Sequence, residues 1–249
     1  MIKKQFRFVF LALLLFAATT LTGQSLQDKT SVYDSLVLEA FLDGDMRKWE
    51  NIIEKMERQY KQNPDADMLF HLTTASYGLT GYLLGNDEED RAEDALDKTI
   101  RFNEKLAETS YKSESQAILA GTYGYKISMS PFKAVFFGRK NQNAIDKAME
   151  LDSSNPMAWM EKGNAYYHMP GMFGGSYEKA ITHYAKSTDL YEDRSKKYPE
   201  WLRMNTLVWL AKSHAKNGNR EKAVSLYRKV LEMAPGFKWV KEELLPEVE

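Results

Sequence analysis

Apolar residues recur three or four positions apart along most of the chain after its first 30 residues, which is the spacing of one face of an α-helix. An apolar stripe over residues 36–41 is followed by a turn at 43–45 and by a second stripe over 49–56. Pro64 ends the second stripe, because the residue before a proline disfavours the helical conformation. The pattern predicts a first pair of helices over about residues 30–62.

A second and weaker pair of helices is expected to follow. It begins near Phe70 and Tyr77, is predicted to turn at Gly81 and Gly85, and resumes at the acidic run 87–90. Negative charge is favourable at a helix N-terminus, because it meets the positive end of the helix dipole. The chain therefore repeats a helix-turn-helix unit.

The clearest copy of this unit covers residues 202–237. Gly218 marks the turn between its halves, Ala223 and Tyr227 lie four positions apart in the second half, and Pro235 follows. A small residue at a helix contact lets two antiparallel helices approach closely, and the aromatic ring fills the space beside the contact.

The segments 154–196 and 202–237 resemble the tetratricopeptide repeat (TPR) family, whose 34-residue unit reads W-x2-L-G-x2-Y, then A-x3-F, then P. The earlier segment carries the motif residues Trp159, Gly163, Tyr166, Ala180 and Tyr184. The later segment departs from the motif in its first helix, where it has Leu207, Ala211 and His214. The resemblance implies an all-α fold, a TPR-like right-handed solenoid of about five antiparallel helix pairs with a C-terminal capping helix at 237–245.

Two segments lengthen the third and fourth units. In the fourth unit, 21 positions separate Trp159 from Ala180, whereas 16 separate Leu207 from Ala223, and the extra residues fall in HMPGMFGGS at 168–176. The segment SMSPFKAVFFGRKN at 128–141 has similar chemistry in the preceding unit. Since insertions at equivalent points of a repeat lie on one face, we expect two enlarged turns at the rim of a binding surface. The predicted rim residues are Pro131, Phe136, Phe137, Pro170, Phe173, Gly174 and Gly175.

The resemblance also implies a binding groove. In TPR proteins the first helix of each pair lines a concave surface, and the matching positions here are predicted to bind a protein or peptide partner. These positions are Met157, Met160, Asn164, Tyr167, Asn205, Val208, Lys212, Ile118, Thr122 and Tyr125. Members that clamp a C-terminal carboxylate have basic residues where this chain has Met160 and Val208, so that ligand is not expected.

Composition excludes one class of partner and indicates an exported protein. The 249 residues have a formal charge of -1, so a nucleic-acid-binding role is not indicated. Three positive residues precede an apolar run at 8–18 and then small or polar residues, which is the layout of a signal peptide cleaved after Gly23. An uncleaved anchor is the alternative, but the run is shorter than the ~18 to 20 residues of a membrane span.

The mature chain is therefore expected to be one TPR-like helical domain over 24–249, periplasmic or secreted and without a stable membrane span. Its formal charge would be -4, because removal of three positive charges changes -1 to -4. The absence of cysteine excludes disulfides and lipid attachment at a cysteine.

Catalytic and metal-binding motifs are absent from the sequence. A nucleophile would have to be Ser, Thr or Lys, and neither a G-x-S-x-G elbow nor a P-loop is present. The four histidines lack the paired spacing of a metal site, so neither a metal nor a cofactor is expected. The histidines are His71, His168, His183 and His214.

The sequence therefore predicts a non-catalytic, exported binding or scaffold protein that engages a protein or peptide partner. Two alternatives stay open: a solute-binding accessory protein of a transport system, with the enlarged turns gating an apolar pocket, and an enzyme that uses the region of His168 and His183. The same scaffold can host all of these roles.

Overall fold

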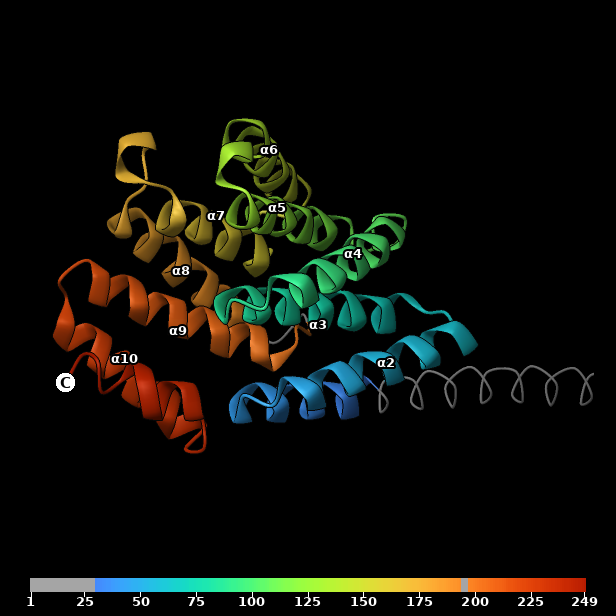
Figure 1. Ribbon diagram of the computed structural model, residues 1–249, viewed down its shortest axis with the longest axis horizontal. Coiled ribbons are helices and arrows are strands. Elements are labelled where there is room, and N and C mark those ends of the chain that lie inside the picture. The colour runs from blue at the N-terminus through green and yellow to red at the C-terminus, as the bar shows by residue number, and fades with distance from the viewer. Residues whose placement is uncertain (1–29, 194–196) are drawn as a thin grey trace, which may run out of the picture.

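Helices follow one another as antiparallel pairs in the computed structural model, which describes residues 30–193 and 197–249 (Figure 1). The first is an N-terminal helix, helical from residue 30 to 43 in the described part. The remaining elements are α2 (Met46–Gln62), α3 (Ala66–Gly85), α4 (Glu89–Leu106), α5 (Lys112–Met129), η1 (Pro131–Lys133), α6 (Ala134–Leu151), α7 (Pro156–His168), η2 (Gly171–Phe173), α8 (Tyr177–Tyr191), α9 (Glu200–Lys216), α10 (Arg220–Met233) and the π-helix η3 (Trp239–Leu244).

The prediction of an all-α TPR-like solenoid is confirmed. The described residues form five helix pairs followed by a short C-terminal helix, and they contain no strand. Among them, no helix has both the length and the apolar character needed to cross a bilayer. The predicted signal peptide, residues 1–23, lies outside the described residues.

Several helices begin at a side chain that accepts a hydrogen bond from the first turn. The Asp45, Asp65 and Asn155 carboxylate or amide oxygens each lie 2.9 Å from such a backbone nitrogen, and the Ser176 hydroxyl lies 3.2 Å from the Lys179 nitrogen. These bonds satisfy backbone N–H groups that have no partner inside the helix. Short polar residues in the sequence therefore fix where these helices start.

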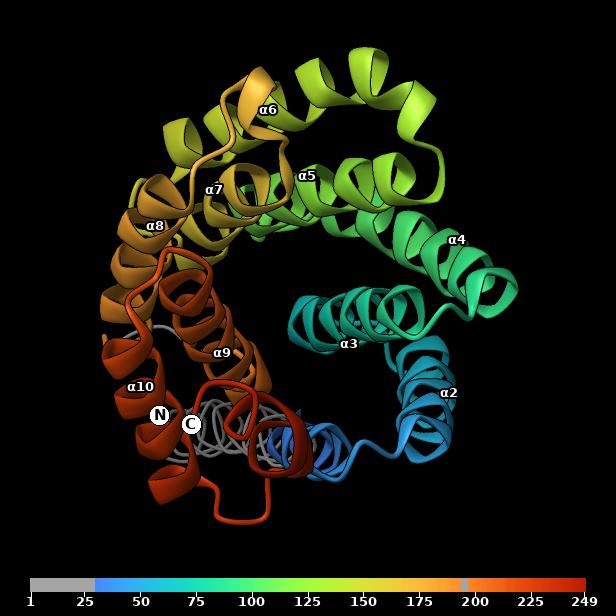
Figure 2. The same cartoon turned by 60° about the vertical axis from the view of Figure 1, so that its left-hand side comes forward.

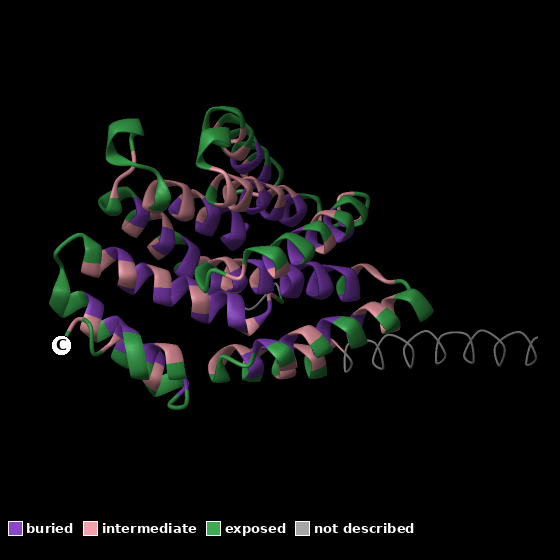
Figure 3. Cartoon of the chain, viewed as in Figure 1, coloured by how far each residue is buried: buried purple, intermediate pink, exposed green. Residues whose placement is uncertain are grey.

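Helix α3 occupies the centre of the superhelix, with the other pairs arranged around it (Figure 2). Its residues 68–77 are all buried, and they are either apolar or small and polar, apart from His71 and Tyr77, so this part of the helix has no charged face. Burial is concentrated on the inward faces of the helices, whereas the turns and outer faces are exposed (Figure 3).

The two ends of the solenoid meet around a cluster of aromatic rings. Phe41 of the N-terminal helix lies 4.8 Å from Phe237 and 6.0 Å from Trp201 between ring centroids, and Trp49 lies 5.2 Å from Trp201. The Trp49 indole also donates a 3.0 Å hydrogen bond to the Ala75 carbonyl of α3. Because first and last repeats share one core, the superhelix is closed on itself.

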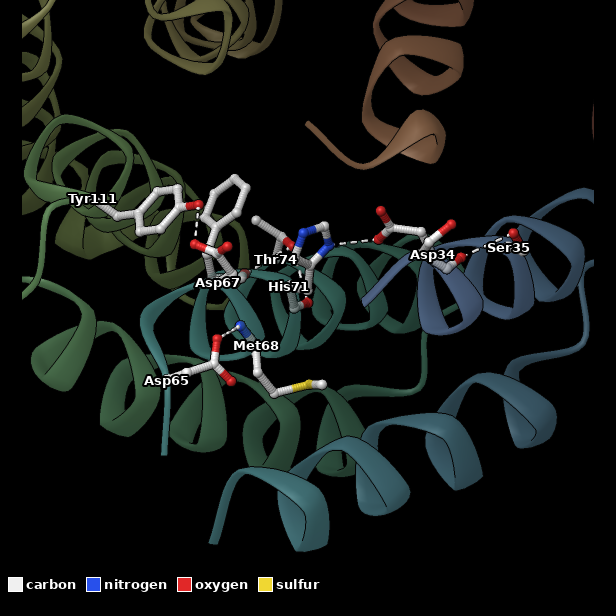
Figure 4. A network of polar contacts seen from close by, with 10 residues as sticks. Asp34, Ser35, Asp65, Asp67, Met68, His71, Thr74 and Tyr111 are labelled. Atoms are coloured by element: carbon white, nitrogen blue, oxygen red, sulfur yellow. Dashed lines mark hydrogen bonds and ion pairs between the residues drawn. The ribbon is translucent and has the colours of Figure 1, made fainter. Parts of the chain in front are cut away.

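Polar contacts fix the N-terminal half of α3 to its neighbours (Figure 4). Nδ1 of His71 lies 2.5 Å from a carboxylate oxygen of Asp34 in the N-terminal helix. On the other side, the Tyr111 hydroxyl donates a 2.8 Å hydrogen bond to Asp67. One charged or polar pair on each side therefore fixes the rotation of α3 about its axis.

Two predicted turn boundaries are wrong. Gly81 lies inside α3 because it makes room for a neighbouring ring: a Cβ at this position would lie 2.5 Å from the Tyr125 hydroxyl. Phe136 and Phe137 lie in α6, which begins at Ala134, because nothing between the short helix η1 and Asn141 stops a helix except a tolerated glycine. Both helices of the third unit are longer than those of the fourth: α5 has 18 residues against 13 in α7, and α6 has 18 against 15 in α8.

Candidate functional site

The predicted groove residues divide into a buried set and a half-buried set. The structure packs five of them into the core, with exposed fractions of 0 or 1%: Met157, Met160, Val208, Ile118 and Thr122. The concave face at this level is filled by α3 and its neighbours, so these side chains stabilise the fold. The half-buried set is Asn164, Tyr167, Asn205, Lys212 and Tyr125.

A buried carboxylate lies beneath the half-buried set. The Tyr77 hydroxyl of α3 donates a 2.5 Å hydrogen bond to Oε1 of Glu161 in α7, and Nδ2 of Asn164 donates a 3.1 Å bond to Oε2. The Tyr184 hydroxyl of α8 in turn donates to Oδ1 of Asn164 at 2.5 Å. Three helices are thus joined through one acidic side chain that is only 2% exposed.

Burial raises the pKa of Glu161 to about 7, because removal from water disfavours the charged form. The hydrogen bonds from Tyr77 and Asn164 oppose this shift by stabilising the carboxylate. No basic residue forms an ion pair with Glu161 in the described part of the chain. The group is therefore poised to change its charge near neutral pH.

Beside this carboxylate, five residues form what we call the Lys212 cluster: Tyr167, His168, Trp209, Lys212 and Trp239. The Lys212 ammonium lies 4.4 Å from the Trp209 ring centroid and 4.9 Å from the Trp239 centroid. Tyr167 and His168, at the end of α7, lie 5.1 and 5.2 Å from Trp209 between centroids. Trp239 comes from η3, so three separate elements build the cluster.

The electrostatics of the cluster follow from partial burial. Desolvation lowers the pKa of Lys212, and the charges of Glu247 and Glu243 act against that shift. Neither carboxylate forms an ion pair with the ammonium in the described part of the chain. Desolvation by the surrounding rings, and then the charge of Lys212, lower the pKa of His168 to about 4, although part of that side chain reaches solvent. At neutral pH the cluster therefore presents one cation, one neutral imidazole and three aromatic rings.

This arrangement suits a ligand with an apolar or aromatic body and an acidic group. Aromatic rings provide a large, rigid contact area, and an ammonium next to them can bind a carboxylate more strongly than it would in water. The side chains of the cluster therefore offer contacts that could bind such a ligand.

The predicted rim residues lie on two turns at one edge of the solenoid. Phe136 is 59% exposed and Phe173 is 70% exposed, and the turn residues Pro131, Pro170 and Gly174 are exposed as well. Phe137 and Gly175 are partly covered, since Phe137 stacks on Tyr123 and Gly175 sits against the Met169 carbonyl. The two turns belong to different repeats, and the second one directly follows His168 of the Lys212 cluster in the chain.

The histidines do not converge. His183 packs against Tyr166 and Trp159 of α7, His168 packs against Trp209, and His71 pairs with Asp34. Among the described residues, no group of three acidic or histidine side chains could hold a metal ion.

A separate cavity of about 560 Å³ lies at the start of α5, lined by residues that include Tyr111, Glu114 and Tyr198. Glu114 is buried and accepts a 2.9 Å hydrogen bond from the Tyr198 hydroxyl. Tyr111, Glu114 and Tyr198 are thus hydrogen-bonded within the protein itself, and we do not assign the cavity a ligand.

Sequence reasoning missed Trp209, Trp239 and Glu161. Trp209 is one residue after a predicted groove position, and the sequence predicts Trp239 only as part of a capping helix. Glu161 carries a signal that could have been used, because an acidic residue inside an otherwise apolar helix needs a partner when it is buried.

Comparison with known proteins identifies a family for one part of the chain. A family model described as "Tetratricopeptide repeat" matches residues 205–237. No curated protein matches the sequence.

Two solved structures share the fold. The HusA haemophore from Porphyromonas gingivalis superposes with a TM-score of 0.61 and 17% identity, over 75% of this chain and 92% of its own. TTC0263, a thermophilic TPR protein from Thermus thermophilus, superposes with a TM-score of 0.57 and 15% identity, over 88% of this chain and 95% of its own.

Proposed function

We propose that this chain, which has the fold of tetratricopeptide-repeat proteins, is a non-catalytic binding module of the cell envelope that engages a peptide or protein partner through the Lys212 cluster. The observation that supports this proposal most directly is Lys212 itself, an ammonium between two tryptophan rings with no carboxylate paired to it in the described chain. A partly buried, unpaired cation is costly, so an anionic group of a partner would be well placed to compensate it.

The proposal narrows the groove predicted from the sequence. Met160 and Val208 are buried, so their apolar character does not decide whether an acidic ligand can bind. Lys212 supplies a cation about one helical turn beyond Val208, and Tyr167 and Asn164 lie on the facing helix. We infer a partner segment that brings an aromatic or aliphatic side chain and an acidic group, either Asp, Glu or a C-terminal carboxylate.

The test is capture of partners from an extract of the exported fraction, followed by affinity measurement with the identified partner. Lys212→Gln should weaken binding about tenfold or more, because a charge-assisted contact is worth roughly 1.5 to 3 kcal/mol. Lys216→Gln is the matched control: it removes an exposed charge one turn further along the same helix and should leave affinity unchanged. Equal affinity for wild type and Lys212→Gln would refute the assignment of this site.

A second candidate function is capture of a flat, apolar, acidic small molecule such as haem. It is favoured by the similarity in fold to a haemophore, together with aromatic rings arranged around a cation in the Lys212 cluster. A haem has a planar apolar ring and two carboxylates, which match those two features, and the neutral imidazole of His168 lies beside them.

Titration with haemin, followed by its absorbance spectrum, separates this candidate from the first. Saturable binding that Trp209→Ser weakens about tenfold would support it, since base-like planar rings stacked on an aromatic side chain gain roughly 1 to 3 kcal/mol. Haemin that shows no saturable binding would leave the partner-protein proposal as the function of the cluster.

Export to the periplasm or beyond is part of the proposal and depends on the N-terminal sequence pattern. Cleavage after Gly23 would leave Gln24 as the first mature residue. N-terminal sequencing of the protein from its native compartment tests this, and an intact Met1 in the cytoplasmic fraction would contradict it.

A further inference from the structure

Two turns of the molecule, the first of them together with the start of α6, expose large apolar side chains that nothing in the described chain covers. In the first, Phe132 is 99% exposed and Val135 is 93% exposed. In the second, Met172 is 85% exposed and Phe173 is 70% exposed. Scattered single exposures are ordinary, but these lie in two clusters at turn positions, which is the pattern of an interaction surface.

The two turns point in the same direction. In Figure 1 they stand at the upper edge of the molecule, and they remain at the upper edge in Figure 2, which is turned about the vertical axis. A flat surface laid against this edge would therefore touch both turns at once. We call this edge, with Phe132, Val135, Phe136, Met172 and Phe173, the turn edge.

The sequence segments that form the two turns carry basic residues and no acidic ones. From residue 115 to 145 the sequence contains no acidic residue, whereas it contains four basic ones, Lys126, Lys133, Arg139 and Lys140. None of the four forms an ion pair in the described part of the chain, and the Lys140 ammonium lies 4.0 Å from the Phe136 ring centroid. The second turn is also free of acidic residues from 162 to 177.

We propose that the turn edge docks the protein on the surface of an anionic lipid bilayer. The exposed phenylalanine and methionine side chains would enter the boundary between headgroups and acyl chains, while the four cations contact lipid phosphates. This proposal rests on residues other than those of the Lys212 cluster, and it does not depend on the function proposed for that cluster.

A bilayer fits these observations better than a protein surface. Protein hot spots are surrounded by near-neutral contacts that exclude water. Here nearly fully exposed side chains stand on two separate turns, with cations rather than a mixed polar ring beside them. The surface of an anionic bilayer is complementary to both features, because its acyl chains can accept the apolar side chains and its phosphates can contact the cations.

The test is flotation of the full-length protein with vesicles of phosphatidylcholine alone and with added phosphatidylglycerol. We expect binding that requires phosphatidylglycerol and decreases as salt increases. Lys133→Glu with Lys140→Glu should reduce partitioning about tenfold or more, and Phe132→Ser with Phe173→Ser should do so as well. The charge-matched control is Lys222→Glu with Lys229→Glu on α10, which should bind as wild type does.

A site-specific reporter separates the turn edge from the apolar N-terminal residues, which every variant retains. Because the chain has no cysteine, Phe132→Cys can carry one environment-sensitive dye, and Lys229→Cys is the control position. The dye at position 132 should shift to the blue on anionic vesicles, and the dye at 229 should not. No shift at position 132, or equal flotation of wild type and both turn-edge variants, would overturn the proposal. It would also fail if these variants instead lost capture of a protein partner while the wild type ignored vesicles.

Discussion

Phe237 and Phe132 are both phenylalanines, but their side chains lie in opposite environments. Phe237 is fully buried where the ends of the solenoid meet, and Phe132 on the turn edge is 99% exposed. Aromatic residues therefore have two roles in this protein. Buried rings join repeats that are far apart in sequence, whereas the rings of the turn edge contribute little to the fold and remain available for binding.

The largest expected effect comes from removing the buried ring. Phe237→Ala should lower the free energy of unfolding by about 3 to 5 kcal/mol, because it leaves a cavity between Phe41 and the last repeat. Phe132→Ala should change it by less than about 0.5 kcal/mol, as is usual for exposed positions. Urea denaturation followed by circular dichroism measures both.

The comparison would fail in either of two ways. A small effect at Phe237 would mean that the closure of the solenoid adds little stability, and a large effect at Phe132 would mean that the turn edge is part of the core. The second result would also weaken the proposal of membrane docking.

A pH-dependent difference of a few kcal/mol at most is expected from Glu161. Its pKa is raised from 4.5 to about 7 in the folded chain, so between these pH values the folded chain retains a proton that the unfolded chain has released. The stabilising contribution of the protonated acid is present below pH 4.5 and is lost as pH rises to about 7. Glu161→Gln, which stays uncharged, should lose less stability than wild type over this range.

Denaturation curves at a series of pH values measure that difference. Other titrating groups affect both proteins equally, so the informative quantity is the free energy of unfolding of the wild type minus that of the variant. A constant difference from pH 4.5 to pH 7 would show that Glu161 is not protonated in the folded protein.

A smaller effect distinguishes two glycines of the same helix. A Cβ at Gly121 of α5 would lie 2.5 Å from the Tyr77 ring, whereas a Cβ at Gly124 would meet no atom within 4 Å. Gly121→Ala should therefore destabilise the protein by about 1 to 3 kcal/mol through overpacking. Gly124→Ala should stabilise it by about 0.5 to 1 kcal/mol, because alanine is the better helix former. The same sign for both in urea denaturation would contradict the close fit of α3 and α5.

The sequence alone is sufficient for the helix pairs and for the enlarged turn at 169–176. Apolar periodicity, Gly218 and Pro235 are local signals, and local signals fix local structure. The TPR-like solenoid follows from comparing two segments that each hold part of one motif.

The sequence does not reveal which distant repeats come into contact, because those contacts depend on how small rotations between successive repeats accumulate. The contact between Phe41 and Phe237 joins residues at opposite ends of the chain. Met160 and Val208 are buried because α3 and its neighbours fill the concave face (Figure 2). Gly81 is mistaken for a turn residue because glycine occurs both in turns and inside helices where another side chain approaches closely. Only the position of Tyr125 shows that the second reason applies here. The Lys212 cluster is predicted only in part, since its tryptophans lie outside the positions that the motif assigns.

The smallest expected effect on stability distinguishes a glycine in a turn, Gly174, from a glycine in the interior, Gly121. Gly174 has φ of +98°, and a Cβ at this position would meet no atom within 4 Å, so its role is conformational and not one of space. Gly174→Ala should cost about 1 kcal/mol, and Gly174→Asn should cost less, because asparagine tolerates positive φ better than alanine does. At Gly121 the order should reverse, since asparagine is larger and meets Tyr77. If asparagine lowers the free energy of unfolding more than alanine does at both positions in urea denaturation, steric space limits both sites. The conformational role assigned to Gly174 would then be wrong.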